Sequence, residues 1–186
     1  MRHIVLEGEK VCLATPERKD IKKIYEYYGK WELRRHLGEP RSNFPVFYED
    51  EEKFYEEIIE NKNRKEEIIL AIIEKESNEL VGLIGLYGIR WVSRSAEIEC
   101  WIGKEYWGKG YATEAVRLML KYAFEYLNLN KVWAGVIEGN KASIRVLEKN
   151  GFKLVGRMRK HEWVPGAGYQ DSLVFEILRE EYESKE

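Results

Sequence analysis

Residues Ile98 to Ala115, I-E-C-W-I-G-K-E-Y-W-G-K-G-Y-A-T-E-A, decide the fold that we predict for this chain. The stretch begins with alternating apolar residues, passes through Gly103, Gly108 and Gly110, and enters a helical pattern. It therefore predicts a strand, a glycine-rich loop and a helix. The first N–H groups of a helix lack acceptors within the helix, and glycines let the backbone approach a ligand closely. Such a loop is suited to binding phosphate groups.

Three kinds of phosphate ligand fit this loop to different degrees. The P-loop pattern G-x-x-x-x-G-K-[ST] is nearly matched from Gly103 onward, but Gly110 stands where a serine or threonine binds magnesium. A dinucleotide-binding fingerprint fits less well, because Thr113 occupies the position of the third small residue. Coenzyme A is the third ligand, and a glycine turn that binds nothing is the remaining alternative.

Composition limits the class of protein. The chain has 186 residues, 44% of them hydrophobic and 34% charged, and a formal net charge of −2. These values predict one globular domain over residues 1–186, and the near-neutral charge argues against nucleic-acid binding. Cys12 and Cys100 make no disulfide framework, and His3, His36 and His161 lack the spacing of zinc ligands. The lack of ligand spacing predicts a protein without a metal. Neither a signal sequence nor a membrane-spanning apolar run is evident, so we expect a cytoplasmic protein.

Periodicity and turn residues predict the order of the secondary-structure elements. Helices are expected from Thr15, as the N-cap, to Gly29, and then over residues 31–37, 50–61, 111–127 and 140–149. Strands are expected over residues 10–15, 67–75, 80–90, 96–103, 131–137, 152–163 and 169–178. The short links among the second to fourth strands predict an antiparallel meander ahead of the glycine loop. A P-loop enzyme would instead carry its motif after the first strand of a parallel sheet.

This order of elements resembles the GNAT superfamily of N-acetyltransferases over nearly the whole chain. Residues 107–112, W-G-K-G-Y-A, are similar to the signature [QR]-x-x-G-x-[GA], with Trp107 in place of glutamine or arginine. Residues 140–152, N-K-A-S-I-R-V-L-E-K-N-G-F, and 168–172, G-Y-Q-D-S, resemble the branch containing ribosomal-protein N-terminal acetyltransferases, to which spermidine acetyltransferases are close. The resemblance implies an α/β fold with flanking helices, whose mixed sheet splays open after the fourth strand, with acetyl-CoA in the gap.

The resemblance also implies which residues bind acetyl-CoA. The backbone of Cys100, Trp101 and Ile102 would line the pantetheine and the acetyl group, Asn140 would contact the pantetheine arm, and Lys149 the adenosine phosphates. The pyrophosphate would bind the glycine loop and the first helical turn: Trp107, Gly108, Lys109, Gly110, Tyr111, Ala112 and Thr113. Independently of the resemblance, the apolar strand pattern around Cys100 favours a small core residue over a nucleophile.

Acetyl transfer to an amine requires a group that takes the amine proton. Alternation along the fourth strand places Glu97 and Glu99 on one face, about 7 Å apart, where two carboxylates raise each other's pKa. Either glutamate is therefore a candidate general base. The alternatives are that they form ion pairs with Arg90 or Arg94, and that proximity of the reactants carries much of the rate.

The departing thiolate requires a proton donor. Spermidine acetyltransferases and many other GNAT enzymes have a tyrosine where this chain has Leu147. Ser143, the serine of N-x-x-S, resembles the serine assigned this role in the ribosomal branch, and a capping or helix-surface serine is the alternative. Five aromatic residues either line an acceptor groove or belong to the core: Tyr27, Tyr28, Trp31, Trp91 and Trp163.

The sequence therefore predicts an acetyl-CoA-dependent N-acetyltransferase, a monomer or homodimer, whose acceptor is a protein N-terminal α-amine. The alternative acceptor is a small amine such as spermidine or an aminoglycoside. A catalytically silent acyl-CoA-binding regulator and a P-loop NTPase are the alternatives from other classes.

Overall fold

The computed structural model describes residues 2–37, 45–60 and 65–184. Within these residues, one sheet has the strand order β1-β2-β3-β4-β5-β6-β8-β7. Its strands are β1 (Ile4–Glu7), β2 (Val11–Ala14), β3 (Ile68–Glu74), β4 (Leu80–Arg90), β5 (Ser95–Ile102), β6 (Lys131–Ile137), β7 (Lys153–Val164) and β8 (Gly168–Leu178). The helices are α1 (Ile21–Tyr28), α2 (Trp31–Arg34), α3 (Tyr48–Glu60), α4 (Tyr111–Lys121), α5 (Lys141–Lys149) and α6 (Arg179–Glu183).

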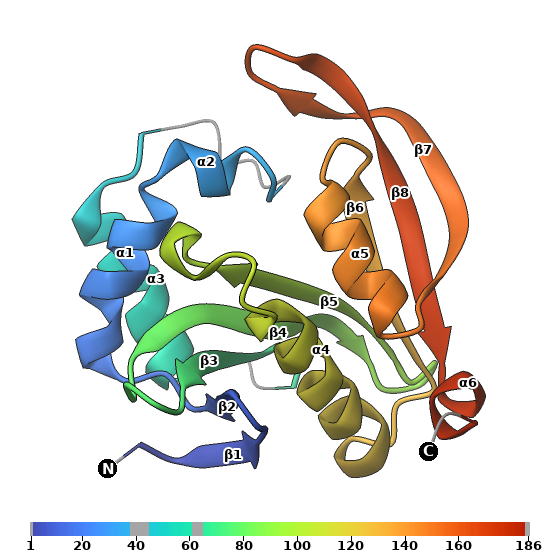
Figure 1. Ribbon diagram of the computed structural model, residues 1–186, viewed down its shortest axis with the longest axis horizontal. Helices are drawn as coiled ribbons and strands as arrows, with labels where there is room; N and C mark the ends of the chain where they lie inside the picture. Colours follow the sequence, from blue (N-terminus) through green and yellow to red (C-terminus); the bar gives the residue numbers. More distant parts are fainter. Residues whose placement is uncertain (1, 38–44, 61–64, 185–186) are drawn as a thin grey trace.

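Neighbouring strands of the sheet are antiparallel except β5 and β6, which are parallel. The ladder between β5 and β6 is confined to Ser95–Glu97 opposite Lys131–Trp133. Beyond it the two strands diverge in a V (Figure 1). This confirms the predicted meander over β3, β4 and β5 and the predicted splay after the strand 96–103.

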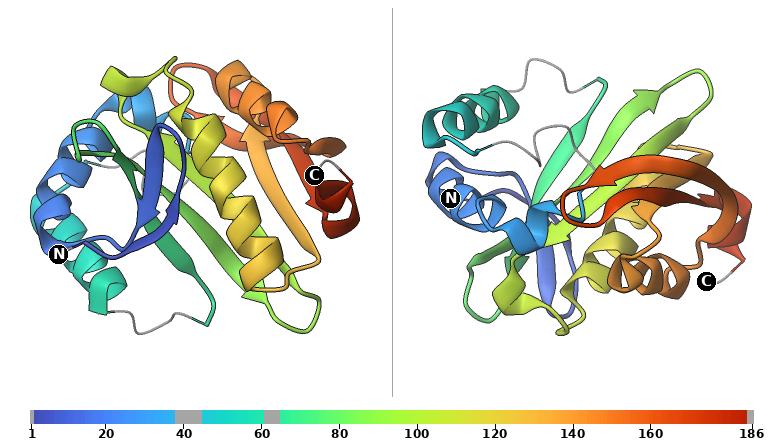
Figure 2. Two further views of the ribbon diagram at one scale, coloured as in Figure 1. Left: turned by 60° about the horizontal axis from the view of Figure 1, so that its bottom comes forward. Right: turned by 90° about the horizontal axis from the view of Figure 1, so that it is seen from above.

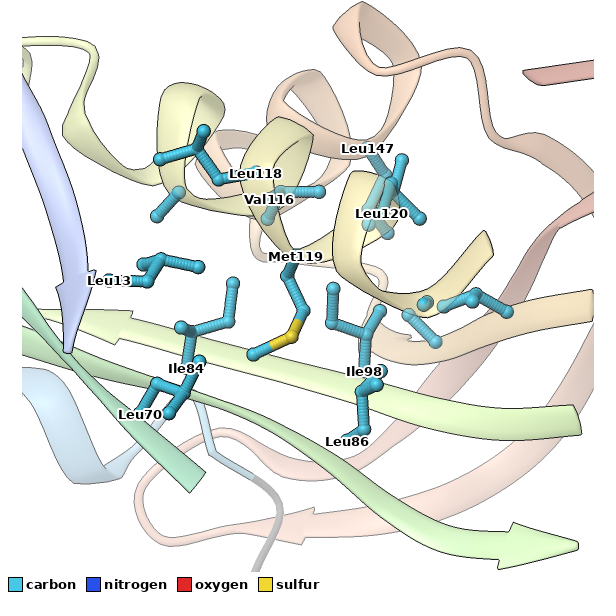
Figure 3. Close-up of a cluster of buried hydrophobic side chains, with 14 of the residues drawn as sticks. Leu13, Leu70, Ile84, Leu86, Ile98, Val116, Leu118, Met119, Leu120 and Leu147 are labelled. Atoms are coloured by element: carbon cyan, nitrogen blue, oxygen red, sulfur yellow. The ribbon is translucent and has the colours of Figure 1, made fainter. Parts of the chain in front are cut away.

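The two faces of the sheet carry separate layers of helices (Figure 2). Alternate strand residues such as Leu70 and Ile84 pack against α4 and α5, whereas residues such as Ala71 and Leu83 pack against α1 and α3. Met119 of α4 is fully buried and lies between Ile84, Leu86 and Ile98, on the face of the sheet that α4 and α5 cover (Figure 3). Because each strand presents alternate residues to opposite faces, β5 is fixed between the two layers and leaves one backbone edge facing the V.

At the N-terminal end one strand was missed and one helix start is wrong. The strand predicted over residues 10–15 is confirmed as β2, but it is the second strand rather than the first, because β1 precedes it across a turn. Thr15 is not an N-cap: a 3₁₀ turn at Arg18–Asp20 precedes α1, and the Asp20 carboxylate accepts the N–H of Glu17 at 2.8 Å. Asp20 is buried because Arg2 pairs with it at 2.8 Å, a contact between distant residues that no local pattern reveals. Further along, α4 ends at Lys121 and continues as a π-helical turn, Tyr122–Tyr126.

Candidate active site

The glycine loop borders a cleft of about 380 Å³ that we call the glycine-loop cleft. It is lined by the predicted coenzyme residues Cys100, Trp101, Ile102, Trp107, Gly108, Gly110, Tyr111, Ala112, Thr113, Asn140 and Lys149. Gly108 and Gly110 have φ angles of +77° and +86°, a region that glycine enters readily, and Gly110 is the N-cap of α4. The uncapped N–H groups of the first turn of α4 are therefore available beside this cleft.

Two cations on one face of α5 extend the phosphate-binding character of this cleft. Arg145 and Lys149 are four residues apart, both are exposed, and both line the glycine-loop cleft. The cleft thus combines a helix N-terminus, left-handed glycines and two cationic side chains, which fit the phosphates of a coenzyme. Sequence reasoning named Lys149 and missed Arg145, whose position on the same face of α5 was the available signal.

Lys109 differs from its predicted neighbours. Its ammonium group lies 5.0 Å from the ring centroid of Tyr106 and 5.7 Å from that of Tyr111, and its side chain lines a separate surface depression. Any contribution of Lys109 to phosphate binding therefore rests on its backbone. Trp107, the departure from the signature, donates its indole N–H to the carbonyl of Ile102.

The free edge of β5 presents backbone donors to the V. Gly103 donates its N–H to Val81 of β4 at 2.8 Å. Because backbone groups alternate in direction along an antiparallel strand, the N–H groups of Cys100 and Ile102 point away from β4. Cys100 is partly buried: it packs against the core and also lines the glycine-loop cleft. Desolvation raises the pKa of its thiol to about 12, which keeps it protonated at neutral pH and disfavours it as a nucleophile.

A second cleft of about 440 Å³ adjoins the first, and we call it the β6 cleft. Both clefts share Cys100, Trp101, Asn140 and Ser143, so they meet at the divergence of β5 and β6. The three predicted catalytic residues, Glu97, Glu99 and Ser143, all line the β6 cleft.

Glu97 is half-buried, and its burial raises the pKa of its carboxyl group. The backbone N–H of Gly135 in β6 bonds to this carboxylate and opposes the shift. The cause of the raised pKa differs from the prediction: burial, rather than the charge of Glu99 nearby, produces it. Among the described residues, neither Arg90 nor Arg94 contributes to the shift, so an ion pair with arginine does not set the protonation of Glu97.

Ser143 lies in the first turn of α5 next to both clefts. Asn140 caps this helix, with its side-chain oxygen 3.2 Å from the backbone nitrogen of Ser143. The cap thus uses the backbone of Ser143 and leaves its hydroxyl group out. Leu147, one turn further, is buried in the core with Phe152.

Several lining residues were missed from the sequence. His36 lies after α2 and lines both clefts, and burial lowers its pKa. Trp133 of β6 and Glu162 of β7 line the β6 cleft. Their places depend on which elements meet across the V, and no local pattern signals them. The five candidate groove aromatics are absent from the described linings of both clefts, and Tyr27 and Tyr28 are buried core residues.

Comparison with known protein families identifies the family to which this chain belongs. The model of the acetyltransferase (GNAT) domain matches residues 10–153. The chain belongs to the GNAT acetyltransferase family. Within the described residues of this GNAT chain, no helix is long and apolar enough to cross a membrane.

Individual relatives agree with this family. A spermidine N(1)-acetyltransferase of Vibrio cholerae serotype O1 is 29% identical over 175 residues, which are 94% of this chain and 96% of that protein. A putative ribosomal N-acetyltransferase, YdaF of Bacillus subtilis, is 40% identical over 106 residues, or 57% of each chain. An uncharacterized N-acetyltransferase, p20 of Bacillus licheniformis, is 38% identical over 112 residues, 60% of this chain and 62% of the relative. The last two matches thus span less than two thirds of the relatives' lengths.

A solved structure confirms the fold over almost the whole chain. The crystal structure of spermidine N-acetyltransferase from Vibrio cholerae, in complex with CoA and spermine, superposes with a TM-score of 0.82 at 27% sequence identity. The superposition covers 95% of this chain and 99% of that one.

Proposed function

We propose that this GNAT protein transfers the acetyl group of acetyl-CoA to a primary amine of a small polycation, of which spermidine is an example. In this proposal the coenzyme binds in the glycine-loop cleft and the acceptor in the β6 cleft. The alternative acceptor of the sequence analysis is thereby preferred over a protein N-terminus, because spermidine acetyltransferases are among the relatives that match over nearly their full length, whereas the match to the putative ribosomal N-acetyltransferase YdaF covers 57% of each chain.

The observation that carries the proposal is the separation of charge between the two clefts. Among the described residues that line the glycine-loop cleft, Arg145 and Lys149 are the lysine and arginine side chains, and none is a glutamate or aspartate. The described lining of the β6 cleft holds the opposite set: it contains Glu97, Glu99 and Glu162 and no lysine or arginine. One cleft therefore attracts phosphates and the other attracts cations, and both open onto the same stretch of β5.

Acetyl transfer forms a carbon–nitrogen bond, breaks the thioester bond, removes a proton from the amine and adds one to the departing sulfur. We assign the first proton transfer to Glu97, whose raised pKa makes its carboxylate a stronger base, with Glu99 on the same strand as the alternative. The N–H groups of Cys100 and Ile102 are fixed donors for the carbonyl oxygen. Ser143, at the junction of the clefts, is assigned the proton donation to sulfur.

A peptide N-terminus is the second candidate acceptor. It is favoured by one specific feature, Leu147 in place of the tyrosine of spermidine acetyltransferases, together with Ser143 of the ribosomal-type motif. The relative YdaF, a putative ribosomal N-acetyltransferase, supports the same candidate.

Thiol release from acetyl-CoA tests the proposal. Spermidine, spermine, an aminoglycoside and peptides with free N-terminal serine or alanine are compared at matched concentrations. We expect kcat/KM for the polyamines to exceed that for the peptides at least tenfold. Faster turnover of the peptides would establish the second candidate, and tight CoA binding without release for any amine would indicate a silent coenzyme-binding protein.

A further inference from the structure

Strand β7 departs from regular pairing next to the β6 cleft. Met158 lies opposite Ser172, and Glu162 lies opposite Gln170. Three residues of β7, 159–161, therefore face the single residue Asp171 of β8, which makes a β-bulge. Lys160, at its centre, has a φ of +50°, a left-handed conformation that is unfavourable for a residue other than glycine.

Asp171 makes the contacts that hold this conformation. One carboxylate oxygen accepts the backbone N–H of Lys160 at 2.8 Å, and the other accepts Nη1 of Arg157 at 2.9 Å. Arg157 also pairs with Glu138 at the end of β6, and Glu138 donates its N–H to the carbonyl of Asp171 at 3.0 Å. The N–H of Lys160 and the guanidinium of Arg157 lower the pKa of Asp171, so its carboxylate is charged at neutral pH.

The bulge determines which β7 side chains reach the β6 cleft. Met158, His161 and Glu162 all line it. In a regular strand the consecutive residues His161 and Glu162 would point to opposite faces. Continued regular pairing from Met158 would place Glu162 opposite Gly168, about 7 Å further toward the hairpin turn. The bulge is therefore what brings Glu162 into the same cleft as Glu97.

We propose that Asp171 is a positioning residue for the acceptor: it holds the β7 bulge, and the bulge places Glu162 to bind a second cationic group of the acceptor. The amine that reacts lies at Glu97, and the distal cation lies at Glu162. This inference rests on the proposed function of the β6 cleft. It makes the hairpin β7–β8, which rises beyond α5 in Figure 1, a determinant of acceptor choice.

Steady-state kinetics test the proposal by comparing the change in the KM for spermidine with the change in the KM for acetyl-CoA. We expect Asp171→Ala to raise the KM for spermidine at least tenfold and to leave the KM for acetyl-CoA within twofold. Asp171→Asn should recover most of this loss, because its amide oxygen can still accept the N–H of Lys160. Arg157→Gln is the matched control, since it removes the ion pairs and keeps the Asp171–Lys160 bond; its spermidine KM should rise less than threefold.

A double-mutant cycle tests whether Asp171 acts through Glu162. Glu162→Gln should raise the spermidine KM about as much as Asp171→Ala does, and combining the two should add little. Additive effects, an unchanged spermidine KM in Asp171→Ala, or an equal rise for both substrates would overturn the proposal.

Two further measurements separate this inference from the proposed function. Hydrogen exchange at the Lys160 amide should accelerate in Asp171→Ala and stay slow in Arg157→Gln, whatever the acceptor is. Unchanged exchange in Asp171→Ala contradicts the role of Asp171 in holding the bulge. Calorimetry with CoA-saturated wild-type protein should detect spermidine binding, and its absence overturns the polyamine assignment alone. In that case the same mutant cycle, run with the amine or peptide that the thiol-release panel identifies, decides the role of Asp171.

Discussion

The indole nitrogen of Trp107 lies 2.7 Å from the backbone oxygen of Ile102, to which it donates a hydrogen bond. Trp107 stands at the first position of the coenzyme-binding signature, where glutamine or arginine is usual, and Ile102 is the last residue of β5. The bond ties the glycine loop to the end of the strand that carries the proposed carbonyl donors. The unusual tryptophan thus acts within the protein, by fixing the loop against β5.

Removing this bond should loosen the loop. We expect Trp107→Phe, which keeps an aromatic ring and loses the N–H, to raise the KM for acetyl-CoA about three- to tenfold with little change in kcat. Initial-rate kinetics at saturating amine measure both constants. A fall in kcat at unchanged acetyl-CoA KM would contradict a role in holding the loop.

The left-handed conformation of Gly110 should be required for coenzyme binding. At a φ of +86°, an alanine side chain costs roughly 1–2 kcal/mol, even though its Cβ would meet only the Lys10 ammonium, at an ordinary 3.7 Å. Gly110→Ala should therefore lower the melting temperature by several degrees and weaken CoA binding, as calorimetry would show. Gly139→Ala is the control, because its φ is outside the left-handed region and its Cβ would meet no atom within 4 Å. Equal losses in both variants would argue against backbone strain at Gly110.

The raised pKa of Glu97 predicts the form of the pH profile. A base must be ionised, so kcat/KM should rise as the pH passes upward through the pKa of Glu97, above its ordinary value of 4.5. Glu97→Gln should lower kcat at least a hundredfold and abolish that limb of the profile. Persistence of the limb in the variant would transfer the role to Glu99, for which Glu99→Gln is the matched test.

The same residue makes a prediction for stability. A carboxyl group whose pKa is higher in the folded state than in the unfolded state stabilises the fold when it is protonated. This contribution is fully present below the pKa of the unfolded state and is lost as the pH rises through the pKa of the folded state. Wild-type stability should therefore decline over that window, relative to Glu97→Gln, whose amide oxygen can still accept the N–H of Gly135. Urea unfolding at a series of pH values measures the difference, and parallel curves would contradict it.

Variants at Ser143 and Asn140 should separate the effects of catalysis from those of helix capping. Since the cap uses the backbone N–H of Ser143, Ser143→Ala should lower kcat at least tenfold and leave the melting temperature within about 1 °C. Asn140→Ala should cost about 1 kcal/mol of unfolding free energy, or about 2–4 °C. Differential scanning fluorimetry and thiol release measure the two effects. Wild-type turnover in Ser143→Ala would remove its hydroxyl from the mechanism.

Local patterns predicted most of the elements because the signals that specify them lie within a few residues. The strands Leu80–Arg90 and Lys131–Ile137 end where the apolar runs end, and Asn140 caps α5 as its position before the helix indicates. The errors fall where distant groups decide. Asp20 can start the turn before α1 only because Arg2 compensates its buried charge, and the sequence gives no sign that these residues meet.

The sequence by itself determined the glycine loop, the alternation that puts Glu97 and Glu99 on one face, and the resemblance to GNAT enzymes, because hydrophobic period and glycine position are local properties of the chain. Only the tertiary structure decided that β5 and β6 part after Glu97, that Lys109 turns away from the cleft, and that Glu162 joins Glu97. The physical reason is that charge separation and burial depend on which segments pack together. Strand divergence and a bulge held by Asp171 set that packing, and both arise from contacts between residues far apart in the chain.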